Sequence, residues 1–152
     1  MTDALTFLKT RRSRPAKILT APVPDREALE ALLCTAARTP DHGKLEPWRF
    51  IVLEQAALRR LGALARKLAQ TVGPEVVDPD KASQQFENGQ LAVVVVASPK
   101  PCDRFPQIEQ TYSAGAVCLA LLNAALASGW GANWLSGWAS HNRDFCTEAL
   151  AL

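Results

Sequence analysis

The sequence predicts one α+β domain in which helices cover both faces of a central β-sheet. Its 152 residues fit a single domain that can bury its own core. The 48% content of hydrophobic residues argues against disorder. Apolar residues recur at helical spacing in six segments, whereas three segments are typical of strands. This balance predicts a layered, helix-rich fold.

The three strand predictions rest on short apolar runs. Residues 48–53 follow a proline and read Trp-Arg-Phe-Ile-Val-Leu. Residues 91–98 are rich in valine and almost entirely apolar, which predicts a central strand covered on both faces. Residues 131–135 are the third candidate, and Gly137 after them leaves the backbone free to approach a ligand.

The helix predictions follow apolar periodicity, capping residues and helix breakers. They cover residues 4–10, 25–38, 55–70, 80–88, 106–128 and 142–152. Between Ala114 and Ala127 the longest helix has Asn123 as its one strongly polar residue. A helix that is apolar all round belongs in a large core or a subunit interface. In a chain this short, we expect the interface.

Composition and charge disfavour several functional classes. A net charge of +2 gives no global field for nucleic acid. The longest purely apolar run, residues 91–97, has the length of a strand, so no membrane span is expected. No signal peptide is visible at the N-terminus. Because the four cysteines lack metal-ligand spacing, we expect reduced core residues, no metal site and a cytoplasmic protein.

A basic run at residues 9–17 holds five basic residues and no acidic one. Three interpretations are open: a solvated surface run, a nucleic-acid patch, or a clamp for one small anion. The run is short and has no interleaved aromatic residue, which disfavours nucleic acid. The forked guanidinium groups of Arg11 and Arg12, followed by the hydroxyl of Ser13, match the geometry of a phosphate.

A second candidate site is the loop between Pro40 and Pro47. Two prolines restrict the backbone on either side of its ionisable residues, and an apolar strand follows. The ionisable residues of this region are Arg38, Asp41, His42, Lys44 and Glu46. A stiff charged loop beside a core strand suits a ligand site, although an ordinary capped loop has the same composition. A histidine beside a loop aspartate is more often a structural partner than a proton donor.

Four segments together resemble the flavin-dependent nitroreductases, specifically the small single-domain branch of NAD(P)H nitroreductases. They are Arg11-Arg12-Ser13, Arg38-x-Pro40-Asp41-His42-x-x-x-x-Pro47-Trp48-Arg49-Phe50, Ser113-Ala114-Gly115-Ala116 and Trp134-Leu135-Ser136-Gly137. Each segment alone is weak. Their occurrence in family order over nearly the whole chain makes the resemblance strong.

The resemblance implies a three-layer α+β fold with a central mixed sheet, assembled as an intertwined homodimer with two FMN molecules at its interface. Its residue roles are implied in the same way. Arg11, Arg12 and Ser13 would hold the FMN phosphate and ribityl chain. Arg38 and His42 would contact the flavin bound to the partner subunit. Trp134, Leu135 and Ser136 would lie along the isoalloxazine.

The implied activity is electron transfer from NAD(P)H to a nitroaromatic, quinone or similar acceptor by a ping-pong mechanism. The flavin carries this chemistry, so no catalytic side chain is expected, with His42 as a candidate proton donor. Expected partners are a second copy and a small-molecule acceptor, without nucleic acid or membrane. The alternatives are a non-catalytic flavin-binding protein, a truncated dimeric interaction module and a nucleic-acid adaptor. Larger relatives have Ser, Asn and Gln where this chain has Asp41, Lys44 and Glu46, which leaves the acceptor open.

The resemblance also carries an expectation about the end of the chain. Relatives continue past the last helix with a further core strand and a segment that wraps the other subunit. We therefore expect residues 1–152 to form one FMN-binding domain without that strand. Such a domain would bind FMN more weakly and turn over more slowly than full-length relatives.

Overall fold

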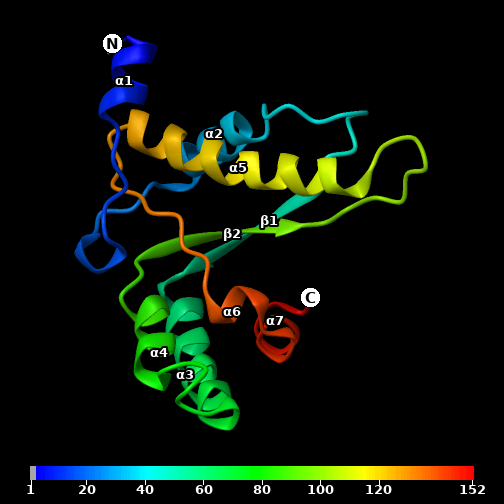
Figure 1. Ribbon diagram of the computed structural model, residues 1–152. Coiled ribbons are helices and arrows are strands. Elements are labelled where there is room, and N and C mark those ends of the chain that lie inside the picture. Colours follow the sequence, from blue (N-terminus) through cyan, green and yellow to red (C-terminus); the bar gives the residue numbers. More distant parts are fainter. Residues whose placement is uncertain (1–2) are drawn as a thin grey trace. The chain divides into compact units, whose positions relative to one another are not determined.

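Two compact units make up the computed structural model, which describes residues 3–152 (Figure 1). The first comprises Pro22–Ile51, Val93–Trp134 and the described residues before Ala16, and the second comprises Ala16–Ala21, Val52–Ala92 and Leu135–Leu152. Strands β1 (Trp48–Glu54) and β2 (Leu91–Ala97) pair in a two-stranded sheet, and each strand runs from one unit into the other.

Both paired strands were predicted, but the surroundings of β2 differ from the prediction. Its first six residues are half-buried rather than fully enclosed. Among the described residues β1 is its one strand neighbour, so the sheet does not enclose it on two edges. The predicted strand at residues 131–135 is wrong, because no ladder forms there. One backbone bond, from the N–H of Arg14 to the carbonyl of Ala132 at 3.0 Å, holds this segment instead.

The first unit contains three helices: α1 (Ala4–Thr10), α2 (Arg26–Ala36) and α5 (Gln107–Ala127). Aspartates cap the first two, because Asp3 accepts from the N–H of Thr6 at 3.1 Å and Asp25 from that of Ala28 at 2.9 Å. Helix α2 packs along α5 (Figure 1), and both contribute to one core. The buried residues of this core are Leu32, Ala36, Ala114, Val117 and Leu122.

Helix α5 buries one side and exposes the other. On the buried side, Gln110 exchanges two hydrogen bonds with the backbone of Lys100, at 2.7 and 2.9 Å. On the open side, Ile108, Tyr112 and Leu119 are 51%, 68% and 45% exposed. Residues 3–152 therefore do not bury α5 on all sides, as a core position would require. By length and composition alone α5 could cross a membrane, a test that core helices of soluble proteins also pass.

The second unit is built on the pair α3 (Gln55–Val72) and α4 (Pro79–Glu87), which lie side by side (Figure 1). Their shared core contains Leu58, Leu61, Ala65, Ala69 and Ala82. Helix α7 (Arg143–Leu150) packs against α3, and its Phe145 is 2% exposed. Two short helices, η1 (Ala16–Ile18) and α6 (Trp138–His141), were not predicted, since three or four residues are too few to show a period.

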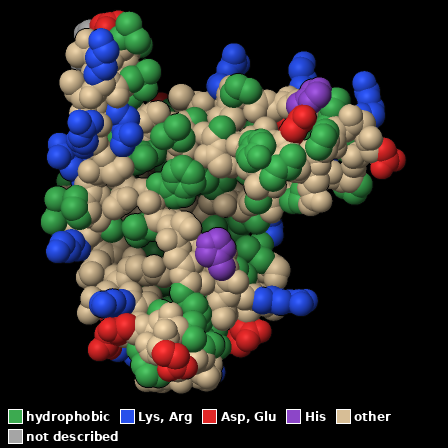
Figure 2. Space-filling view, viewed as in Figure 1, with side chains coloured by type: hydrophobic (Ala, Val, Ile, Leu, Met, Phe, Trp, Pro, Cys, Tyr) green, Lys and Arg blue, Asp and Glu red, His purple; other side chains and the backbone are tan. Residues whose placement is uncertain are grey.

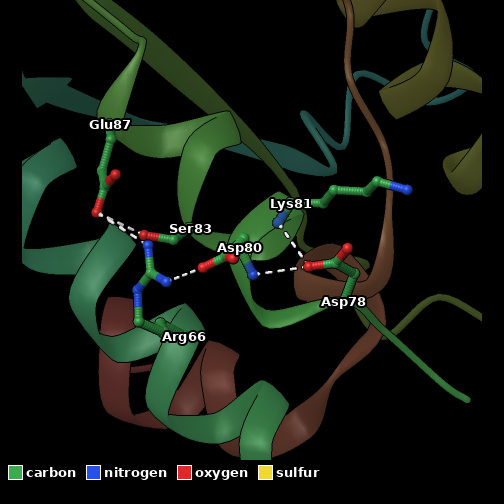
Figure 3. Close-up of polar contacts among 6 residues, drawn as sticks. All are labelled: Arg66, Asp78, Asp80, Lys81, Ser83 and Glu87. Carbon is green, nitrogen blue, oxygen red and sulfur yellow. Dashed lines mark hydrogen bonds and ion pairs between the residues drawn. The ribbon is translucent and has the colours of Figure 1, made fainter. Parts of the chain in front are cut away.

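Several helix ends differ from the predictions by one or two residues, and two of them have a clear local cause. Helix α4 begins at Pro79 rather than at residue 80, and Asp78 caps it, because its Oδ1 accepts the N–H groups of Asp80 and Lys81 at 2.9 and 3.2 Å (Figure 3). Pro79 is the first residue of the helix, which moves the cap to the residue before it. Helix α7 stops at Leu150 and not at residue 152, because Ala151 adopts a left-handed conformation with φ 55°.

Asp80 takes part in an ion-pair cluster between α3 and α4 (Figure 3). The Arg66 guanidinium binds the Asp80 carboxylate and lies 4.0 Å from that of Glu87. Glu87 in turn accepts a 2.5 Å hydrogen bond from the fully buried Ser83 hydroxyl. The cluster therefore joins the polar sides of two helices whose apolar sides share the core.

Candidate functional site

The basic run begins where α1 ends, and Lys and Arg side chains gather at α1 and the segment just after it (Figure 2). The segment is tied to the chain at both ends. The N–H of Arg11 donates to the carbonyl of Phe7 at 2.7 Å, and that of Arg14 donates to Ala132 at 3.0 Å. The Arg-Arg-Ser motif therefore lies between the end of α1 and the segment that follows α5.

These two segments line an open cavity of about 320 Å³ within the first unit. Its lining consists of Phe7, Thr10, Arg11, Arg12 and Arg14 on one side and Leu126, Gly129, Trp130 and Gly131 on the other. The turn at Gly129, with φ +86°, ends α5 and forms part of the wall. The volume lies at the lower end of the roughly 300–1,000 Å³ that is usual for small-molecule sites.

Arg11 has a buried donor that no described residue satisfies. Its Nη2 donates to the Ser13 hydroxyl oxygen at 3.2 Å, whereas its Nε is buried without a hydrogen-bond partner. Arg12 uses Nη1 to bind the carbonyl of Arg11 at 2.9 Å. An unpaired buried donor is costly, because it has lost its bonds to water without gaining a partner in the protein. Arg11 thus contacts both Ser13 and Arg12, and Arg11 and Arg12 line the cavity whereas Ser13 does not.

The loop between Pro40 and Pro47 is tightly constrained. Asp41 accepts the N–H of Glu46 through Oδ2 at 2.6 Å. Three residues have positive φ: Gly43 at 81°, Lys44 at 54° and Glu46 at 48°. A positive φ costs a non-glycine residue free energy, and such strain concentrates at functional sites. Asp41 therefore holds the loop closed rather than pairing with the neighbouring histidine.

His42 takes its partners from another part of the first unit. Its Nδ1 lies 2.6 Å from Oε2 of Glu109, which belongs to the first turn of α5. Its ring stacks on Phe105 with 3.7 Å between centroids. Near by, the buried Ser113 hydroxyl donates to the carbonyl of Pro40 at 3.0 Å. The side-chain partner of His42 is thus Glu109 and not the neighbouring Asp41, which bonds to Glu46.

The clamp, residues 11–13, and the loop, residues 40–47, lie at opposite ends of α5 (Figure 1). The loop contacts Glu109 and Ser113, whereas the cavity is lined by Leu126. Seventeen residues of helix separate Glu109 from Leu126, which corresponds to about 25 Å. Neither Arg38 nor His42 lines the cavity. Within one chain, these two groups of predicted site residues therefore do not form one site.

The last predicted group, Trp134, Leu135 and Ser136, is exposed. Trp134 is 49% and Leu135 is 52% accessible, so both side chains are open to contacts from outside their units. Ser136 contacts His141 within the second unit, with 3.4 Å between Oγ and Nε2. Trp134 is the last residue of a segment of the first unit, and Leu135 begins a segment of the second.

Sequence reasoning missed three residues of these sites. Trp130 lines the cavity, and Phe105 and Glu109 hold His42. Glu109 carries a signal in the sequence, because it is the one charged residue between Gln107 and Ala127. A single charge in an otherwise uncharged helix indicates a specific contact with another residue or a ligand. Trp130 and Phe105 have no comparable signal, because each fits an ordinary core position as well.

Comparison of the sequence with known proteins identifies a family and several relatives. The sequence model of the Nitroreductase family matches residues 8–152. A protein of Haemophilus influenzae named "Putative NAD(P)H nitroreductase" is 41% identical over 138 residues, which cover 89% of this chain and 73% of the relative. The protein of Escherichia coli K12 named "Putative NAD(P)H nitroreductase YdjA" is 36% identical over 135 residues, with the same coverage of both chains.

Solved structures support the same fold. The crystal structure of a nitroreductase-like family protein from Bacillus cereus superimposes with a TM-score of 0.78 at 22% identity, covering 100% of this chain and 79% of the other. A nitroreductase family protein from Clostridium novyi gives a TM-score of 0.71 at 22% identity, with coverage of 99% and 77%. At this level of identity the likeness concerns the fold alone, which is helix-rich α+β as predicted.

Proposed function

Because this chain belongs to the nitroreductase family, we propose that it is an FMN-dependent oxidoreductase that uses NAD(P)H. Its acceptor would be a nitroaromatic, a quinone or a similar oxidised compound, reduced in a ping-pong cycle. When bound, the flavin supplies the redox chemistry by taking a hydride from reduced nicotinamide and passing electrons to the acceptor. The protein binds and orients the reactants and controls access to them.

The observation that carries the proposal is the unpaired buried Nε of Arg11 beside a cavity of about 320 Å³. If the Arg11 side chain turns so that Nε faces the cavity, a phosphate there would accept from this N–H and replace a costly unsatisfied donor with a charge-assisted hydrogen bond. Arg12 and Arg14 add positive charge to the same wall, and the Ser13 hydroxyl is already oriented by Arg11. These residues fit the phosphate end of FMN, and they would hold it through several donors.

We propose further that each flavin is shared between two copies of the chain. The Arg11 cavity and His42 lie at opposite ends of α5, about 25 Å apart by helix rise. If both contact flavin, as the family resemblance implies, a second copy would bring His42 and Arg38 to the flavin held by the first. The exposed apolar side chains of α5 offer a surface for that copy. Such an interface would give α5 the burial that one chain does not provide.

The exposed Trp134 fits a position along the isoalloxazine, together with Leu135 and Ser136. Their accessibility leaves them free to contact a flat ring, and an aromatic or aliphatic side chain gains from covering it. The proposed enzyme is a cytoplasmic homodimer, in keeping with cysteines that form no disulfide in the described chain. Its other partner would be a small-molecule acceptor.

The test of this proposal is FMN binding by the Arg11→Ala variant. Loss of a charged hydrogen bond should weaken FMN binding by about 1.5–3 kcal/mol. Flavin fluorescence titration measures the affinity, and oxidation of NADH or NADPH with a quinone acceptor measures activity. Arg59→Ala, at an exposed position of α3, is the matched control and should bind FMN as the unmodified protein does.

Two results would contradict the proposal. If the unmodified protein purified without flavin absorbance and did not bind added FMN, FMN would not be its cofactor. If Arg11→Ala bound FMN with unchanged affinity, FMN would remain the cofactor, but Arg11 would not be one of the residues that hold it. Binding of FMN without oxidation of either nicotinamide would favour the non-catalytic flavin-binding alternative.

A further inference from the structure

A second acidic residue, Glu109, contacts the predicted flavin-site histidine from a distant part of the sequence. Its Oε2 lies 2.6 Å from Nδ1 of His42, and 67 residues separate the two in the chain. Glu109 is itself fixed in the first turn of α5, where its N–H donates to the carbonyl of Pro106 at 3.1 Å. A carboxylate in the first turn of a helix is also favoured by the helix dipole. The backbone of Glu109 is therefore held in place independently of the histidine.

The contact determines which ring nitrogen carries the proton in neutral His42. An ionised carboxylate has no hydrogen to donate, so at 2.6 Å the imidazole must donate from Nδ1–H. In a neutral ring, Nε2 is then the acceptor and carries no proton. None of the described residues forms a hydrogen bond with Nε2 of His42, and the side chain is 60% exposed.

Packing fixes the plane of the same ring. Phe105 lies against His42 with 3.7 Å between centroids and 37° between planes. The guanidinium carbon of Arg104 lies 5.4 Å from the centroid of Phe105, which adds a cation–π contact to the stack. Next to the histidine, Gly43 at φ +81° leaves no room for a Cβ, because Phe105 fills that space. The ring is thus restrained by a hydrogen bond at one edge and by an aromatic ring across one face.

We propose that Glu109 and Phe105 are positioning residues that hold His42 as its Nδ1–H tautomer and leave Nε2 as the atom that meets the ligand. This inference rests on the proposed function, because it assumes that His42 contacts the flavin or its acceptor. The group it recognises is a hydrogen-bond donor, an N–H or O–H, which neutral Nε2 accepts. A rigid, correctly protonated imidazole loses little freedom on binding, which is how such orienting contacts improve a site.

The first test observes the histidine directly in the protein without added ligand. Long-range ¹H–¹⁵N correlation spectra distinguish the two imidazole tautomers. The chain has two histidines, so a His141→Asn variant leaves the His42 ring as the single imidazole signal. Spectra are recorded above the pH at which the ring becomes protonated. We expect the Nδ1–H tautomer in this background and a shift toward Nε2–H when Glu109→Gln is added.

The Glu109→Gln change keeps the shape of the side chain and removes its charge. Glu148→Gln, at an exposed position of α7, makes the same chemical change elsewhere and should leave the tautomer unaltered. Glu109→Asp shortens the side chain but keeps the carboxylate, so it should retain the Nδ1–H form at least in part. Unfolding midpoints of all variants identify any loss of fold. A tautomer that is the same in Glu109→Gln and in the unmodified protein would overturn the inference.

The second test asks whether the two residues act as one unit on the ligand. Glu109→Gln and His42→Ala should each weaken FMN binding or acceptor turnover by roughly tenfold, the upper size of one neutral hydrogen bond. The double variant should lose no more than His42→Ala alone, because both changes remove the same contact. Full additivity would show that Glu109 acts elsewhere.

The two tests separate this inference from the proposed function. If the unmodified protein binds no FMN, the proposed function fails, while the tautomer experiment still decides the role of Glu109. If FMN binds normally and the tautomer does not depend on Glu109, the inference fails and the proposed function stands.

Discussion

Gly43 shows how a single residue shapes the candidate loop. It adopts φ +81°, and an added Cβ would overlap the Phe105 ring. Gly43→Ala should therefore lower the free energy of unfolding by about 1–3 kcal/mol and displace His42 from Glu109. Gly129→Ala is an informative control, because φ is +86° there but nothing lies within 4 Å of the added Cβ. Chemical denaturation of both variants separates the effect of the steric overlap from that of the backbone strain. Equal losses of unfolding free energy in the two variants would argue against the overlap.

The cysteines differ in exposure, which corrects the expectation that all four are core residues. Cys34 is exposed on α2, whereas burial raises the pKa of the Cys118 thiol on α5. A raised pKa leaves less reactive thiolate near neutral pH, and the fraction recovers only as the pH rises through that value. Alkylation followed by mass spectrometry should therefore label Cys34 well before Cys118. Faster labelling of Cys118 at pH 7 would contradict the burial.

At the scale of elements, the pair α3 and α4 depends on its apolar contacts more than on its ion pairs. Leu61 is completely buried between the two helices. Leu61→Ala should lower the free energy of unfolding by about 2–5 kcal/mol, through lost burial and the cavity left behind. Val76→Ala, at a position that is 59% exposed, should stay within about 0.5 kcal/mol. Denaturant unfolding of both variants measures this difference. Similar losses of unfolding free energy in the two variants would show that Leu61 is not a core residue.

The ion pairs of Arg66 provide the contrast within the same element pair. Its side chain is 39% exposed, and its partners Asp80 and Glu87 are 68% and 43% exposed. Charges this accessible to water are screened and contribute about 0–1 kcal/mol. The cluster in Figure 3 thus contributes little to the stability of the unit.

At the scale of the whole molecule, the exposed side of α5 is the surface to test for self-association. Ile108, Tyr112 and Leu119 lie at spacings of four and seven residues, which places them along one stripe of the helix. Hydrophobic side chains are visible along α5 in Figure 2. We expect the double variant Tyr112→Glu/Leu119→Glu to sediment as a monomer and to bind FMN more weakly, because charges would be buried at the interface.

The control for this experiment is Val76→Glu, which places the same charge at an exposed apolar residue of the second unit. It should leave both the sedimentation coefficient and FMN affinity unchanged. A monomeric double variant that binds FMN with full affinity would argue against a flavin site shared between two copies.

The sequence by itself determined the family, the positions of the longer helices and two strands, and the location of the candidate residues. These features are local: caps, prolines and apolar periods act over a few residues, and Arg11-Arg12-Ser13 are neighbours in the chain. The same locality explains the wrong strand at residues 131–135. Its composition suits a strand, but a strand also needs a ladder partner, and Arg14 provides one hydrogen bond.

Only the tertiary structure decided which distant groups meet. It paired His42 with Glu109 across 67 residues, and it set the turn after α5 beside Arg11 to line the cavity. It also placed the clamp and the loop at opposite ends of α5. The physical reason is that such contacts depend on how helices pack and where loops return. A local pattern of residue types constrains neither of these.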